Sequence, residues 1–243
     1  KINNIIQIEK KYAHLRAPIK IDGRKIMEEF GVSQGKLVGE LLHLLRISYL
    51  NGEWMTNGPD PLYTKAREYL KESFVFQDPG YYVGIVCPCC QGQENFEKMK
   101  RESAQEDSQL TYANIFVNSN YEYFQRNFVP LFAQRNVVLV ANKTSTVQNL
   151  PFGGEFYGVE YDAWVKNIDL INHLESRDDS DKLFLFACGP LGKILSQRLW
   201  KANKKNTYLD IGSTLHPWLN SDINIRGYYT DDPFWRTKIC NWG

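Results

Sequence analysis

The stretch Leu183-Phe-Leu-Phe-Ala-Cys-Gly-Pro-Leu-Gly-Lys193 has the pattern of a strand, a turn and the start of a helix. Its first four residues are continuously apolar, which is typical of a strand covered on both faces, as in a parallel sheet. The two glycines that follow allow a tight turn. Val137-Val-Leu-Val140 has the same continuous apolarity. Together these stretches predict an α/β protein with a doubly wound, mostly parallel sheet flanked by helices.

Apolar runs alternate with helical patterns from Tyr81 onward, which is the element order of a Rossmann-like core. The strands are expected at 81–86, 110–116, 137–141, 183–187 and 207–211, and the helices between them at 95–102, 121–134, 162–174 and 192–202.

The first 45 residues have a helical pattern. Ser33 is a suitable N-cap, and the apolar residues of 35–45 recur on one helical face. We therefore expect residues 1–45 to be an N-terminal helical flank of the same domain, with the Rossmann-like core in 46–243. A further helix is expected at 62–72.

The composition indicates a folded protein without a strong overall electrostatic field. The 243 residues are 43% hydrophobic, and 29 Lys and Arg against 28 Asp and Glu give a net charge of +1. Near-neutrality argues against steering onto nucleic acid or an anionic membrane, so an anionic ligand needs a local site. No apolar run approaches the ~18 residues of a membrane span. The N-terminal residues lack the pattern of a secretory signal, so we expect a cytoplasmic protein.

Ligands of open parallel sheets bind beyond the carboxyl ends of the strands, so functional residues are expected in the loops at those ends. Lys143 and Ser145 follow a buried strand and deliver a cation and a hydroxyl group to this edge. The turn from Gly189 to Gly192 precedes a helix, whose N-terminus favours anions, and Lys193 could add a positive charge. The alternative is that the glycines only permit a tight turn and that Lys193 lies on the surface.

His216 follows the last predicted strand and is the one histidine in these loops. Its imidazole could serve catalysis or substrate binding. The alternative is a loop imidazole that caps a turn before Pro217.

The five cysteines make a poor disulfide framework, because three lie in Cys87-Pro-Cys-Cys90 and the others are isolated at Cys188 and Cys240. Cys87 and Cys90 have C-x-x-C spacing, but a structural zinc site needs a second pair, which the sequence lacks. Reduced thiols are therefore favoured over a metal site or a thioredoxin-like role.

Four motifs follow one another along the chain: Leu110-Thr-Tyr-Ala-Asn-Ile-Phe-Val117, Val137-Val-Leu-Val-Ala-Asn-Lys-Thr-Ser145, Phe184-Leu-Phe-Ala-Cys-Gly-Pro-Leu-Gly-Lys-Ile-Leu195 and Tyr208-Leu-Asp-Ile-Gly212. In this order they resemble the bacterial GT-D glycosyltransferases, over roughly residues 46 to 220. The resemblance implies transfer of a sugar from a nucleoside diphosphate sugar, with UDP-sugar expected, to a saccharide or glycoprotein acceptor.

The resemblance also implies functional residues. Members of the family carry Asp-Gly-Glu at the end of the first strand, where the carboxylates serve a divalent metal and the donor. Asn51-Gly52-Glu53 stands in that place. Glu53 is thus the expected metal ligand for Mn²⁺ or Mg²⁺, although Asn51 removes one anionic oxygen. Glu53 and His216 are the expected catalytic residues. The expected donor-binding residues are Asn51, Gly52, Asn114, Lys143, Ser145, Gly189, Gly192, Lys193 and Asp210.

Departures from the family pattern keep other functions open. The family's Arg after Tyr-Ala-Asn is not evident, and Ser213 stands where His is usual. A methyltransferase or NAD-dependent enzyme would use the Gly189 turn and bind a ribose through Asp210. A non-catalytic family member is a third reading. Residues 21–45 superficially resemble an RNA-facing segment of tRNA nucleotidyltransferases, which the near-neutral charge disfavours.

Overall fold

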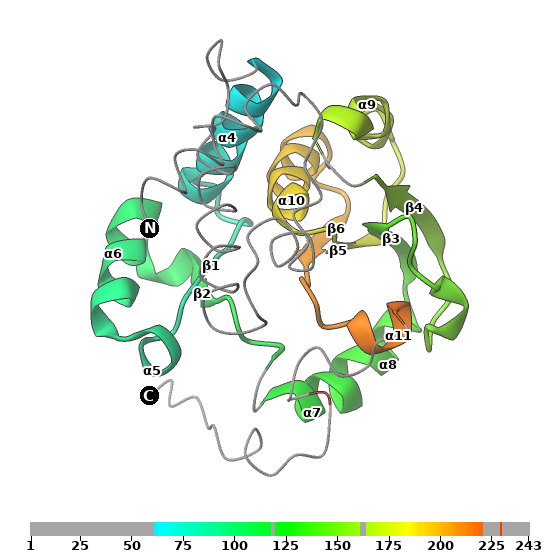
Figure 1. Ribbon diagram of the computed structural model, residues 1–243, viewed down its shortest axis with the longest axis horizontal. Helices are drawn as coiled ribbons and strands as arrows, with labels where there is room; N and C mark the ends of the chain where they lie inside the picture. Colours follow the sequence, from blue (N-terminus) through cyan, green and yellow to red (C-terminus); the bar gives the residue numbers. More distant parts are fainter. Residues whose placement is uncertain (1–60, 118–119, 161–163, 221–228, 230–243) are drawn as a thin grey trace, which may run out of the picture. The chain divides into compact units, whose positions relative to one another are not determined.

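The computed structural model describes residues 61–117, 120–160, 164–220 and Tyr229 (Figure 1). The chain divides into two units, Lys1–Lys65 and Ala66–Gly243, and the second contains the sheets described below. The expected helical flank 1–45, its boundary with the core, and the Asn51-Gly52-Glu53 motif lie outside the described residues and stay predictions.

Helices and strands alternate along the described chain. In chain order they are α4 (Pro61–Val75), β1 (Val83–Ile85), α5 (Pro88–Gln91), α6 (Gln93–Ser103), η1 (Asp107–Gln109), β2 (Leu110–Tyr112), α7 (Tyr121–Tyr123), the π-helical η3 (Phe124–Phe128), α8 (Val129–Phe132), β3 (Asn136–Asn142), η4 (Val147–Asn149), β4 (Glu155–Val159), η5 (Val165–Asn167), α9 (Ile168–Glu175), β5 (Lys182–Ala187), α10 (Pro190–Ala202), β6 (Thr207–Asp210) and α11 (His216–Leu219).

Every strand pair in the described residues is parallel. The larger sheet has the order β4-β3-β5-β6, and β1 and β2 form a separate two-stranded sheet. Strand β3 is central in the larger sheet, where Val138 lies opposite Phe184 of β5 on one side and Glu155 of β4 on the other. The structure thus confirms the α/β class with a parallel, Rossmann-like sheet.

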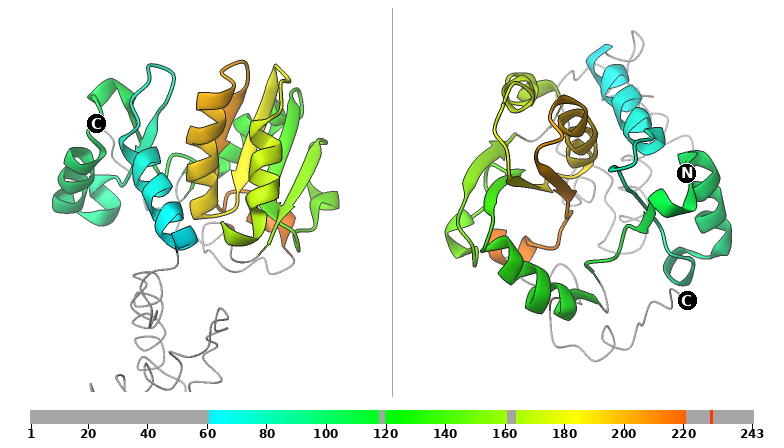
Figure 2. Two further views of the ribbon diagram at one scale, coloured as in Figure 1. Left: turned by 90° about the horizontal axis from the view of Figure 1, so that it is seen from above. Right: turned by 180° about the vertical axis from the view of Figure 1, so that it is seen from behind.

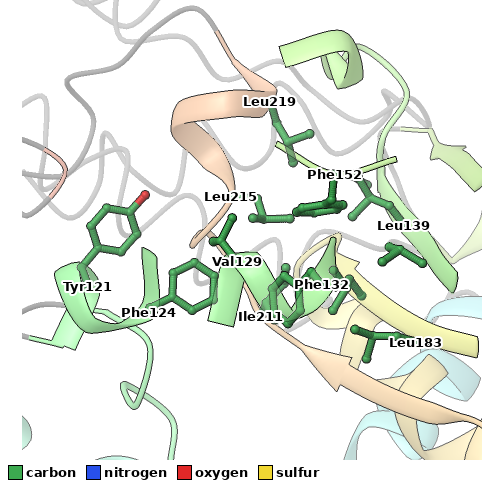
Figure 3. Packing of buried hydrophobic residues seen from close by; sticks show 13 residues of the cluster. Tyr121, Phe124, Val129, Phe132, Leu139, Phe152, Leu183, Ile211, Leu215 and Leu219 are labelled. Carbon is green, nitrogen blue, oxygen red and sulfur yellow. The ribbon is translucent and has the colours of Figure 1, made fainter. Parts of the chain in front are cut away.

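Both faces of β3 and β5 are covered, as their continuous apolarity predicts. On one face, Leu139 and Leu183 pack in a core with aromatic and aliphatic side chains from η3, α8 and the segment around α11 (Figure 3). Phe124 of η3 is fully buried in this core. On the other face, Val138 and Phe184 pack with residues of α9 and α10. Figure 2 shows α9 and α10 side by side on this face of the sheet.

Several elements differ from the sequence expectation. The strand expected at 110–116 ends at Tyr112 in β2, because the chain then turns, with the Ile115 N–H donating to the Tyr112 carbonyl at 3.1 Å. The helix expected at 121–134 has a π-helical middle, η3, directly before Pro130 at the start of α8. Proline has no N–H to continue an α-helical ladder, and a π-helical turn is one way in which a helix accommodates such a break. Strand β4 was not predicted, because its residues are mostly half-buried and include Gly158, so it lacks a continuous apolar run.

Arg177 links the end of α9 to the larger sheet. Its guanidinium donates to the carboxylates of Glu155 and Asp179, and only 15% of the Arg177 side chain is exposed. Lys182 at the start of β5 also donates to Glu155, at 3.0 Å. These cations lower the pKa of Glu155 to about 2, with Arg177 making the largest contribution.

None of the helices in the described part of the chain is long and apolar enough to cross a membrane.

Candidate functional site

The strand order of the larger sheet has a switch point between β3 and β5. From β3 the chain goes to β4 on one side, and from β5 it goes through α10 to β6 on the other side. In open parallel sheets, ligands bind beyond the carboxyl ends of two neighbouring strands that diverge in this way. At these ends lie Asn142, the last residue of β3, with residues 143–145 after it, and Cys188 and Gly189 after β5. We call this region, together with the end of β6 and residues 211–216, the carboxyl edge.

The turn between β5 and α10 requires glycine at position 189. Gly189 has φ +63° and ψ −139°, a conformation that residues with a Cβ rarely adopt. A Cβ added there would meet no atom within 4 Å, so the requirement is conformational and the space beside the turn is open. The first turn of α10 has few backbone donors, because Pro190 lacks an N–H and the Gly192 N–H donates to the Gly189 carbonyl at 3.0 Å. Other groups must therefore supply most of the contacts to an anion.

Gly192 lets α10 approach the ends of β5 and β6 closely. A Cβ on Gly192 would lie 3.0 Å from the Cβ of Phe186 and 3.3 Å from Oδ1 of Asp210. Asp210 ends β6, and its two carboxylate oxygens accept hydrogen bonds from Lys193 Nζ and from the Gly212 N–H, both at 3.0 Å. The structure thus brings Gly192, Lys193 and Asp210 together, as three of the expected donor-binding residues.

The ion pair between Lys193 and Asp210 defines the charge at this end of the carboxyl edge. The Lys193 side chain is 58% exposed, whereas that of Asp210 is 20% exposed. An anionic ligand that recruits Lys193 must therefore compete with Asp210 for the ammonium group, and the lysine has solvent-exposed room in which to turn.

Lys143 pairs with a residue on the β4 side of the sheet, whereas Lys193 pairs on the β6 side. The Lys143 ammonium group pairs with Glu160, which follows β4, and the Lys143 backbone N–H donates to the Val159 carbonyl at 2.9 Å. Lys143 thus pairs with a carboxylate after β4, and Lys193 pairs with one at the end of β6, so the two lysines expected to bind the donor are each engaged by a different carboxylate.

The loop after β3 is ordered by its own side chains. Asn142 Oδ1 accepts hydrogen bonds from the N–H and the hydroxyl of Thr144, at 3.0 and 2.9 Å. The Ser145 N–H donates to the Asn142 carbonyl at 2.9 Å. This turn positions the half-buried Ser145 at the carboxyl edge. Sequence reasoning did not single out the Asn142 side chain, although Asn is a common turn-forming residue.

His216 begins α11 and lies near the loop after β3, because the Thr146 N–H donates to the Leu219 carbonyl at 2.8 Å. The Asn220 amide donates to Nδ1 of His216 at 3.0 Å. When Nδ1 accepts, the proton of a neutral imidazole is on Nε2, which then acts as a donor. Nε2 is buried and has no hydrogen-bond partner among the described residues. The Tyr229 ring stacks on the imidazole, with the centroids 6.1 Å apart.

Burial and the negative charge of Asp210 affect two neighbouring groups that sequence reasoning did not assign to the site. They raise the pKa of Cys188 to about 12, with burial the larger cause. They also raise the pKa of Tyr81. Both groups are therefore protonated and neutral near pH 7, so Cys188 does not offer a thiolate nucleophile at this edge.

Asn114 lies in a different place from the other expected donor-binding residues. It follows β2, at the carboxyl end of the two-stranded sheet, and its amide donates to Sγ of Cys87 at 3.2 Å and to Sγ of Cys90 at 3.5 Å. The structure thus places Asn114 against the cysteine motif, and residues 142–145, 188–193 and 210–216 at the carboxyl edge of the larger sheet.

Comparison of the chain with protein-family models, with curated proteins and with solved structures gives no match in any of the three.

Proposed function

We propose that the protein is a glycosyltransferase that moves a sugar from a nucleoside diphosphate sugar, UDP-sugar by preference, to a glycan acceptor. The observation that supports this proposal is the unit from β5 through the Gly189 turn and α10 to Asp210 of β6. Such a unit suits a nucleotide, because an acidic residue at the end of the second strand can accept hydrogen bonds from ribose hydroxyls.

The reaction assigns a distinct task to each group. The acceptor oxygen bonds to the anomeric carbon of the sugar, the bond from that carbon to the diphosphate oxygen breaks, and its electron pair leaves with the nucleoside diphosphate. The acceptor proton passes to a general base; Glu53 and His216 are the catalytic residues that the resemblance implies. Lys193 leaves Asp210 to stabilise the charge that develops on the diphosphate. Nε2 of His216 gains a partner by donating to a ligand oxygen.

The described residues of the carboxyl edge do not suit a divalent metal. The Asp210 carboxylate is paired with Lys193, and the Glu160 carboxylate with Lys143. Mn²⁺ or Mg²⁺ prefers several oxygen ligands without such competition. We therefore derive no step through a metal, and a bound cation would depend on Glu53 and the donor diphosphate.

Titration calorimetry with UDP tests the proposal. We expect Lys193→Met to weaken UDP binding about tenfold, because it removes a charge-assisted hydrogen bond to the diphosphate. Lys205→Met is the matched control. Lys205 precedes β6 at the amino end of the strand and pairs with Asp178. Its side chain is about as exposed as that of Lys193. Equal UDP affinity in the two variants would contradict the proposed site.

A second function uses the same unit. A methyltransferase or a nicotinamide-dependent enzyme also places a glycine turn and an acidic strand end around a nucleotide, so the position of Asp210 favours it too. Thermal shift with UDP-sugars, NAD and S-adenosylmethionine, each with and without Mn²⁺, separates the readings, because a ligand that binds the folded state raises the melting temperature. Stabilisation by NAD or S-adenosylmethionine alone would exclude glycosyl transfer. UDP-sugar binding without transfer to any acceptor would indicate a non-catalytic member.

A further inference from the structure

The carboxyl end of the two-stranded sheet carries a group of three cysteines. Cys87 comes two residues after β1 and is the N-cap of α5, and Asn114 comes two residues after β2. The N–H groups of Cys90 and Gln91 both donate to the Cys87 carbonyl, at 3.2 Å. This tight turn brings the side chains of Cys87, Cys89 and Cys90 to one end of the short helix.

The three sulfur atoms are close enough to share one ion. Sγ of Cys87 and Sγ of Cys89 are 3.1 Å apart, and the three Sγ atoms all lie within 4.8 Å of one another. Zinc–sulfur bonds of ~2.3 Å in tetrahedral geometry place neighbouring sulfur atoms roughly 3.8 Å apart. The 3.1 Å separation is somewhat shorter than this value, and no separation exceeds it by more than about 1 Å, so small side-chain rotations would bring the three sulfur atoms to a metal.

The surroundings hold one side of the group and leave the other accessible. The Cys87 side chain is buried, and its sulfur accepts a hydrogen bond from the Asn114 amide at 3.2 Å. Cys89 and Cys90 are exposed, so an ion can reach the group from solvent.

We propose that Cys87, Cys89 and Cys90 bind one thiophilic d¹⁰ metal ion, with Zn²⁺ as the probe. Within the described residues the group supplies three protein ligands, which is one fewer than a closed structural zinc site. The fourth position is open to water or to an exogenous ligand. Asn114 keeps the sulfur atoms in place by donating to two of them, so it is a positioning residue.

The sequence favoured reduced thiols, because it offers no second ligand pair beside Cys87 and Cys90 and the other cysteines are isolated at Cys188 and Cys240. C-x-x-C spacing is a pairwise pattern, and the sequence offered no second pair. The third ligand is Cys89, which lies inside the motif and comes close to Cys87 only because the chain turns at Pro88. The group needs no histidine or distant cysteine.

The test is zinc binding to the full chain, purified under reducing conditions, in competition with a chromophoric chelator. We expect one Zn²⁺ per chain in the wild type and loss of this equivalent in Cys89→Ser and in Cys90→Ser, whose side chains are exposed and whose substitution leaves the buried core intact. Cys188→Ser and Cys240→Ser are matched controls and should retain the ion. Asn114→Ala should bind about tenfold more weakly.

Two further measurements on the wild type do not depend on the folding of any variant. Co²⁺ should bind with thiolate charge-transfer bands whose intensity corresponds to three sulfur ligands. Zn²⁺ should protect Cys89 and Cys90 from alkylation by iodoacetamide, as read by peptide mass spectrometry. No zinc uptake, unchanged uptake in Cys89→Ser and Cys90→Ser, loss of the ion in Cys240→Ser, or alkylation that Zn²⁺ does not slow would each overturn the proposal.

Discussion

Replacing Gly189 with alanine isolates the conformational cost of the turn at the carboxyl edge. At φ +63° and ψ −139°, an alanine is strained by about 2 kcal/mol, and because nothing lies within 4 Å of the added Cβ, no steric clash contributes. At about 2–4 °C per kcal/mol for a chain of this size, the melting temperature should fall by about 4–8 °C. Differential scanning calorimetry measures the shift, and UDP titration of the same sample measures binding.

Two other glycines supply controls for this experiment. Gly92 has φ +84° with open space around its Cβ position, and it lies between α5 and α6, so Gly92→Ala should destabilise similarly but leave UDP affinity unchanged. Gly153 also has open space but no positive φ, so Gly153→Ala should leave stability unchanged or raise it slightly. The reasoning fails if Gly189→Ala melts at the wild-type temperature, or if Gly92→Ala weakens UDP binding as much as Gly189→Ala does.

Two predictions concern the stability of the larger sheet. Because the pKa of Glu155 is about 2 in the folded protein, below its usual value of 4.5, its ionised form stabilises the fold above that usual value and the contribution is lost as the pH falls toward 2. Between about pH 5 and pH 2, the free energy of unfolding of Glu155→Gln should therefore fall by about 1 kcal/mol less than that of the wild type, a value reduced because the Glu155 side chain is 40% exposed. Urea titrations at each pH measure this difference, and parallel pH profiles would contradict it. Phe124→Ala should cost about 3–5 kcal/mol in the same assay, because it empties a fully buried site, and a loss below about 1 kcal/mol would show that this core is not packed as described.

The elements with strong local signals could be predicted from the sequence. The strands expected at 137–141 and 183–187 match β3 and β5 within a residue at either end, because burial on both faces imposes a continuous apolar run. The expected segment 81–86 is longer than β1, which spans only Val83–Ile85. Strand ends depend on the partner strand, and pairing between distant segments has no local signal.

The sequence predicted where the candidate site residues lie along the fold, but not which residues they pair with. Lys143 and Lys193 were both expected to bind the donor, and both come after strands of the larger sheet. Their ion pairs depend on the strand order, which places β4 beside β3 and β6 beside β5. Asn114 belongs to the smaller sheet, and its contacts with the cysteines depend on the pairing of β1 with β2. The motif at 51–53 lies outside the described residues.

Strand β4 has a single strand neighbour in the described residues, so its outer backbone groups could template the addition of another chain. Glu155 introduces a charged carboxylate at the first position of this strand, and its cationic partners Arg177 and Lys182 lie beside it. Gly158, further along the strand, is exposed and offers no side chain for packing against an added chain. Glu155 and Gly158 make β4 hard to recognise in the sequence. The same two residues discourage another chain from pairing with this edge, so we infer that they protect the protein from aggregation.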